Sequence, residues 1–81
     1  MGRLLTMAEC HIESSMRTAY LAALQTRRSA VEEYGAHFWV FEHPSNPGRF
    51  IEFTEGSSES SIRDALGDAT DMVLWREVEG G

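Results

Sequence analysis

A single cysteine, Cys10, excludes an internal disulfide, and the sequence has few other features that stabilise a small domain. The three histidines stand apart without a cysteine pair, so no zinc-type spacing is present and we expect no metal or cofactor. A chain of 81 residues buries only about 60 to 65% of the surface that its unfolded form exposes. Natural domains of this size usually recruit a disulfide, a metal or a partner chain. Because a disulfide and a metal site are excluded, we expect this domain to be stabilised by a partner chain.

Lysine is absent, and the seven arginines are outnumbered by 13 acidic residues, which gives a formal net charge of −6. A protein that binds the phosphate backbone needs a basic face, whereas these arginines are scattered along the chain. We therefore expect no nucleic-acid partner.

Long apolar runs are also lacking. No stretch approaches the roughly 18 consecutive apolar residues of a membrane span. Near the N-terminus Glu9 and His11 interrupt the apolar residues, and no small-residue cleavage site follows. These features predict a cytoplasmic protein with no membrane association.

Hydropathy patterns and turn residues divide the chain into six elements. Residues 15–34 carry apolar side chains at three- and four-residue spacing, as an amphipathic helix does, with Ser14 or Ser15 as the expected N-cap and Gly35 after its end. A short second helix is expected to begin at Ser57 or Ser58 and to stop at Gly67. Alternation, aromatic residues and turn signals predict strands over residues 4–12, 37–43, 49–55 and 71–78.

This β-α-β-β-α-β order predicts an α+β domain over residues 1–81 with the ferredoxin-like arrangement, a four-stranded antiparallel sheet. Right-handed crossovers place both helices on one face of that sheet. The two middle strands form a hairpin, and we predict that His43 pairs with Arg49 across its loop. The pairs that follow from this register are Phe41–Ile51, Trp39–Phe53, Glu42–Phe50, Val40–Glu52 and Phe38–Thr54.

One face of the predicted sheet is strongly apolar, and we expect it to pack beneath the helices. Its members are Ala8, Cys10, Ile12, Trp39, Phe41, Ile51, Phe53, Val73 and Trp75. The opposite, open face would mix apolar and charged residues, namely Leu5, Met7, Glu9, His11, Phe38, Val40, Glu42, Phe50, Glu52, Thr54, Leu74 and Arg76. Exposed in a monomer, such a patch is a liability, so we predict a homodimer closed through the open face.

Ionisable side chains on that predicted open face are the candidate catalytic groups. Glu52 and His11 are the candidate bases, and enclosure in a dimer chamber would shift their pKa values. Candidate ligand-binding residues around them are Glu9, Phe38, Val40, Phe50, Thr54 and Arg76. The alternative interpretation is that the charged members form a polar rim or an interface ion-pair network.

The hairpin sequence His43-Pro44-Ser45-Asn46-Pro47-Gly48-Arg49-Phe50-Ile51-Glu52-Phe53 resembles a turn and central strand of antibiotic-biosynthesis-type monooxygenases. These belong to the dimeric α/β-barrel superfamily, so the resemblance implies a homodimeric barrel. Two features depart from that group: Thr54 stands where a glutamate is usual, and no histidine follows His43.

Three functions are compatible with the sequence. The first is a homodimer that binds a small apolar or aromatic molecule in a chamber on the open sheet face. The second, implied by the resemblance, is a cofactor-independent monooxygenase acting on a phenolic or quinol-like substrate. The third is an interaction module without catalysis. The sequence does not decide whether the protein is an enzyme.

Overall fold

The computed structural model describes residues 2–67 and 72–78. The strands are β1 (Leu4–His11), β2 (His37–Glu42), β3 (Arg49–Gly56) and β4 (Leu74–Arg76). A 3₁₀ turn, η1 (Ser14–Met16), leads into helix α1 (Arg17–Glu33), and the second helix is α2 (Glu59–Leu66). The β-α-β-β-α-β order predicted from the sequence is therefore confirmed. The expected last strand is shortened to three residues, and position 71, where we placed its start, lies outside the described residues.

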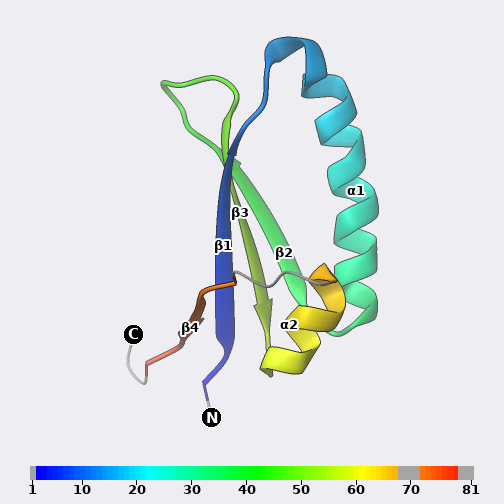
Figure 1. Ribbon diagram of the computed structural model, residues 1–81, viewed down its shortest axis with the longest axis vertical. Coiled ribbons are helices and arrows are strands. Elements are labelled where there is room, and N and C mark those ends of the chain that lie inside the picture. The colour runs from blue at the N-terminus through cyan, green and yellow to red at the C-terminus, as the bar shows by residue number, and fades with distance from the viewer. Residues whose placement is uncertain (1, 68–71, 79–81) are drawn as a thin grey trace.

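The four strands form one antiparallel sheet in the order β2-β3-β1-β4. Both helices lie on the same side of this sheet, and the other side is open (Figure 1). This is the ferredoxin-like α+β arrangement. Because α1 is long and α2 short, α1 provides most of the cover.

The predicted hairpin register is confirmed at every position. Trp39 lies across from Phe53, Val40 across from Glu52, and the backbone amide of His43 donates to the Arg49 carbonyl at 2.8 Å. Strand β1 then pairs with β3, with Met7 across from Phe53 and Ala8 across from Glu52.

The faces of the hairpin, however, are the reverse of our prediction. The aromatic ring of Phe38 and that of Phe50 are buried under α1, and Glu52 and Thr54 lie beside them. The residues that we had placed under the helices face the open side instead, namely Trp39, Phe41, Ile51 and Phe53 from the hairpin and Trp75 from β4. Leu74, across from Thr6, lies on the helix-covered side. Only β1 was assigned correctly, with Ala8 and Cys10 toward the helices.

The apolar core between the helices and the sheet is small. Leu24 and Val31 of α1 pack with Ala36 and Phe38 in one buried cluster. Ile62 of α2 is the most completely buried apolar side chain of the described residues. A core this limited agrees with the expectation that a chain of this length is marginal by itself.

The helix ends are set by local contacts, and one differs from our prediction. Ser58 caps α2, because its hydroxyl accepts a hydrogen bond from the Ser61 amide at 3.2 Å. At α1 the expected serine cap is wrong: the residues in question form the 3₁₀ turn, and the N-cap position is Met16, without a side-chain cap. Gly35 follows α1 with a φ of +75°, the left-handed conformation that favours glycine.

Candidate functional site

The reversed faces divide the predicted site residues into two groups on opposite sides of the sheet. Five of them lie on the side covered by α1, namely Glu52, Phe38, Val40, Phe50 and Thr54. Their expected position on the open face is wrong, because α1 covers their side of the hairpin. Glu9 and His11 remain on the open face, so the structure does not bring the two candidate bases together.

Glu52 lies at the centre of a polar cluster between α1 and the sheet, with only 7% of the residue exposed. The Tyr20 hydroxyl donates to one carboxylate oxygen at 2.6 Å, and Arg27 donates to the other at 2.7 Å. The thiol of Cys10 lies 3.6 Å from the Tyr20 hydroxyl and 3.8 Å from the carboxylate. Burial and the hydrogen bond to Glu52 raise the pKa of Tyr20 well above its ordinary value.

Both oxygens of Glu52 are therefore engaged by donors from α1 before any ligand arrives. Arg27 also places its guanidinium 5.2 Å above the Phe38 ring, and Tyr20 packs against Phe50 at 4.7 Å. These contacts fasten the helix to the sheet. They match the interpretation of Glu52 as part of an ion-pair network more closely than that of a general base, which must reach its substrate.

The open face has a hollow of about 290 Å³ at the end near the hairpin loop. Glu9 lines it and accepts a 2.9 Å hydrogen bond from Arg49, while Phe41 and His43 form its side. His11 lies across from Arg49 on the same face. The ion pair of Glu9 is exposed on both sides, so a large contribution to stability is not expected from it.

Aromatic residues dominate the open face, whereas we had predicted that they lie in the core. Trp39 is 45% exposed, Phe41 58% and Trp75 56%, and Met7 on β1 is 43% exposed. Phe41 and Phe53 meet edge to face at 5.6 Å, and His37 stacks on Trp39 at 6.0 Å. The signal in the sequence that could have indicated the covered face is Arg27, an arginine within the apolar stripe of the long helix, which forms an ion pair with Glu52 on that face.

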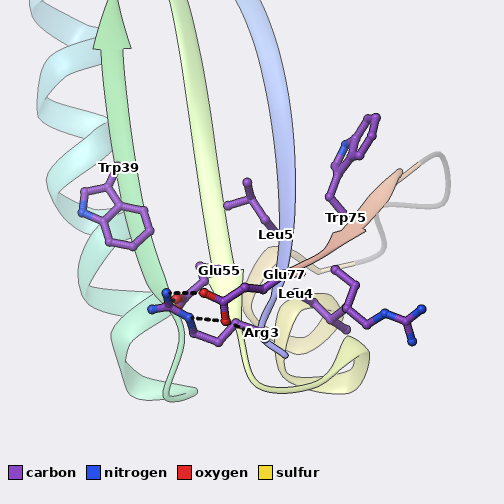
Figure 2. A pocket seen from close by; sticks show the side chains of 8 residues that line it. Arg3, Leu4, Leu5, Trp39, Glu55, Trp75 and Glu77 are labelled. Atoms are coloured by element: carbon purple, nitrogen blue, oxygen red, sulfur yellow. Dashed lines mark hydrogen bonds and ion pairs between the residues drawn. The ribbon is translucent and has the colours of Figure 1, made fainter. Parts of the chain in front are cut away.

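A second hollow of about 330 Å³ lies at the other end of the open face. Trp39 on β2 and Trp75 on β4 stand at its two sides, and Leu5 of β1 lies between them (Figure 2). Of the predicted ligand-binding residues, Arg76 lines this hollow. Arg76 lies across from Leu4, at a strand position that belongs to the helix-covered side of the sheet.

Arg3 and two glutamates form the polar end of the hollow between the tryptophans. The Arg3 guanidinium lies 2.6 Å from Glu55 and 3.0 Å from Glu77, as the dashed lines of Figure 2 mark. The hydrogen bond from Arg3 holds the pKa of Glu77 below its usual range. Glu55 is largely enclosed, with 10% of its side chain exposed. None of the three residues was among our predicted site residues, because they are far apart in the sequence and come together only through the pairing of β1 with both β3 and β4.

Two further observations bear on the kind of site. Within residues 2–67 and 72–78, no three histidine, cysteine or acidic side chains cluster as a metal site requires. None of the helices in the same ranges has the length and hydrophobicity to cross a membrane.

The fold defines the protein as a ferredoxin-like α+β domain with an aromatic open sheet face. Comparison with known proteins adds no narrower assignment, since no family model, no curated protein and no solved structure matches the chain.

Proposed function

We propose that the protein is a homodimer in which the open sheet faces of two copies pack together and enclose a chamber for a small apolar or aromatic molecule. The observation that carries this proposal is the aromatic surface of the open face, with Trp39, Phe41 and Trp75 each about half exposed. Large exposed apolar patches mark interaction sites on water-soluble proteins. A homodimer of this kind is also what the resemblance of the hairpin to the dimeric α/β-barrel superfamily implies.

The size of the open face supports a second copy as its occupant. Strands spaced about 4.8 Å apart, with residues every 3.4 Å or so, give it a projected area of roughly 450 Å². Projecting aromatic rings make the accessible area larger than this projection, and a standard interface buries approximately 800 Å² on each partner. Covering this face would also supplement the small core between the helices and the sheet.

The charges of the face support the same occupant. Its ionic residues are already paired within one copy, Glu9 with Arg49 at one end and Arg3 with Glu55 and Glu77 at the other. The middle of the face is apolar, with Met7, Ile51 and Phe53 in neighbouring strands. A dimer therefore brings apolar centres together and leaves ion-paired polar groups at the rim, as protein interfaces generally do.

The two hollows of the open face support the ligand. Each has a volume of about 300 Å³ and is open in a single copy. Pockets of such a volume, lined by aromatic rings and a few polar groups, are typical of small-molecule sites. Oxygenase activity stays a prediction from the resemblance alone, because Glu52 lies beneath α1 and is occupied by Tyr20 and Arg27.

Sedimentation equilibrium at micromolar concentration tests the dimer. We expect a mass of twice the 9.1 kDa of one chain. Phe41→Ser, at an exposed aromatic residue of the edge strand β2, should shift the protein to monomer while circular dichroism retains the helical signal. Tyr34→Ser is the matched control, because Tyr34 is an equally exposed aromatic residue at the end of α1. A monomeric parent protein, or a Phe41→Ser variant that remains dimeric, would overturn the proposal.

The ligand half of the proposal has its own measurement. Because the chain has two tryptophans and both line one hollow, the two indole N–H signals of a ¹⁵N-labelled sample report on that site. We expect 2-naphthylmethanol, an uncharged aromatic probe, to shift both signals in a saturable manner. Unchanged signals at millimolar probe would contradict a chamber for aromatic molecules.

A further inference from the structure

We propose that the hollow between Trp39 and Trp75 takes a flat aromatic molecule that carries a protonated amine. This inference rests on the proposed function, since it names the ligand class of the same open face. It uses three observations: the two indole walls, the excess of carboxylate at the polar end, and the enclosure of Glu55.

The walls of the hollow are spaced to hold a flat ring system. Trp39 and Trp75 belong to the two outermost strands, three interstrand steps of about 4.8 Å apart. Trp39 is level with Met7 and Trp75 with Leu5, two residues further along, so their backbones are roughly 16 Å apart. Leu5 lies between them and provides an apolar floor (Figure 2). A bicyclic ring seated on Leu5 would contact both indoles, and aromatic contacts of this kind add to the free energy of burial.

The polar end of the hollow favours a positive charge. Two carboxylates, Glu55 and Glu77, share one guanidinium, Arg3, so this cluster carries one negative charge in excess; the second arginine of the lining, Arg76, forms no ion pair with either carboxylate. A carboxylate has more acceptor sites than these ion pairs use, whereas an ammonium brings three donors. The indole faces attract cations as well, and this attraction strengthens when the site is shielded from water.

Burial makes Glu55 the residue that decides selectivity. Its side chain is nine-tenths enclosed even in a single copy, whereas the side chain of Glu77 is 44% exposed. Charges removed from water interact more strongly than exposed ones. Arg76 is the opposing cation at this site: it also lines the hollow and has no ion pair among the described residues. Arg76 pairs with Leu4, so its position in the sheet belongs to the helix-covered side. Glu55 belongs to the open face, in one row with Leu5 and Trp75.

A matched series of probes tests the charge preference. We would titrate the full chain at pH 7 with 2-naphthylmethylamine, 2-naphthylmethanol and 2-naphthoate, which share one ring system and differ in charge. The two indole N–H signals report binding. The expected order of affinity is amine, alcohol, carboxylate, with about a tenfold step from amine to alcohol, which corresponds to about 1.4 kcal/mol.

Variants assign the preference to the carboxylates. Glu55→Gln should bring the affinity for the amine down to that for the alcohol and leave the alcohol unaffected. Glu77→Gln, at a more exposed position, should reduce the amine preference in part and provides a second variant if Glu55→Gln fails to fold. Glu33→Gln is the control, because Glu33 is an exposed carboxylate at the end of α1, away from the hollow. It should bind like the parent.

The result that overturns this inference is tighter binding of 2-naphthoate than of the amine, as dominance of Arg76 would produce, or an amine preference that survives both variants. Sedimentation of the same samples separates this outcome from failure of the proposed function. If the protein is a dimer that binds the alcohol without favouring the amine, the inferred amine preference is refuted and the proposed dimer stands. If the protein is a monomer that binds the amine, the proposed dimer is refuted and the inferred amine preference stands.

Discussion

The Tyr20 hydroxyl donates a hydrogen bond of 2.6 Å to the Glu52 carboxylate, and this bond joins α1 to the middle of β3. Glu52 is almost entirely buried, and Arg27 is its second donor. A buried carboxylate that loses a donor retains its desolvation cost without compensation. The helix is therefore held in place by polar contacts as much as by the apolar core.

Removing the Tyr20 hydroxyl should lower the free energy of unfolding. For Tyr20→Phe we expect a loss of about 1.5 to 3 kcal/mol, the usual value of a hydrogen bond to a charged group. Urea denaturation followed by circular dichroism measures it. Tyr34→Phe is the control, since Tyr34 is half exposed and the change should stay within about 0.5 kcal/mol. Equal effects of the two variants would contradict a structural role for the bond.

Tyr20 should also resist ionisation while the protein is folded. Burial, followed by the hydrogen bond to Glu52, raises its pKa above the ordinary value of 10.0. A raised pKa contributes stability that is complete below the unfolded value, so the free energy of unfolding should fall as the pH rises above 10.0. Tyrosinate absorbance during an alkaline titration measures this, and Tyr20→Phe identifies the late-titrating group. Ionisation of Tyr20 near its ordinary pKa in the folded protein would refute the prediction.

Glu42 should make the stability sensitive to acid. The Arg17 guanidinium, with the Gly48 amide, lowers the pKa of Glu42 from 4.5 to about 2. A depressed pKa contributes stability above the unfolded value, and this contribution is lost as the pH falls from 4.5 toward 2. The urea midpoint of Glu42→Gln should therefore lie below that of the parent at pH 7, and the gap should narrow with acidification.

The control for this experiment is Glu33→Gln, which removes an exposed carboxylate of α1 and should leave the midpoint at pH 7 nearly unchanged. A gap between Glu42→Gln and the parent that is constant from pH 7 to pH 3 would show that the Glu42 ion pair does not act through its charge.

Gly48 should tolerate substitution less well than Gly35. Both have a positive φ, +91° and +75°, so alanine costs backbone energy at either position, about 1 to 2 kcal/mol. At Gly48 an added Cβ would in addition lie 2.5 Å from the Ile12 carbonyl oxygen, whereas nothing lies within 4 Å at Gly35. We expect Gly48→Ala to lower the urea midpoint more than Gly35→Ala does. A smaller effect at Gly48 would mean that the hairpin loop moves away from Ile12 at little cost.

Local signals in the sequence were sufficient for the elements and for the hairpin register. Proline and glycine between residues 43 and 49 fix the loop, and the alternation of aromatic residues on both sides admits one pairing, which places Trp39 across from Phe53. Gly35 and Ser58 likewise mark helix ends through their own backbone and side-chain chemistry. These features depend on neighbouring residues, so a single sequence contains them.

Which face of the hairpin lies under the helices was decided only by tertiary contacts. Both faces carry aromatic residues, so hydrophobicity alone favoured the more apolar one, with Trp39 and Phe41. The structure covers the other face, because Tyr20 and Arg27 of α1 provide Glu52 with donors that no partner on the open side would replace. A buried carboxylate must be paired, and its partner lies 25 or more residues away in the chain. The amino-acid sequence by itself determined the strands, their register and the presence of two apolar faces, whereas long-range pairing of charge determined which face was covered by the helices and which remained open.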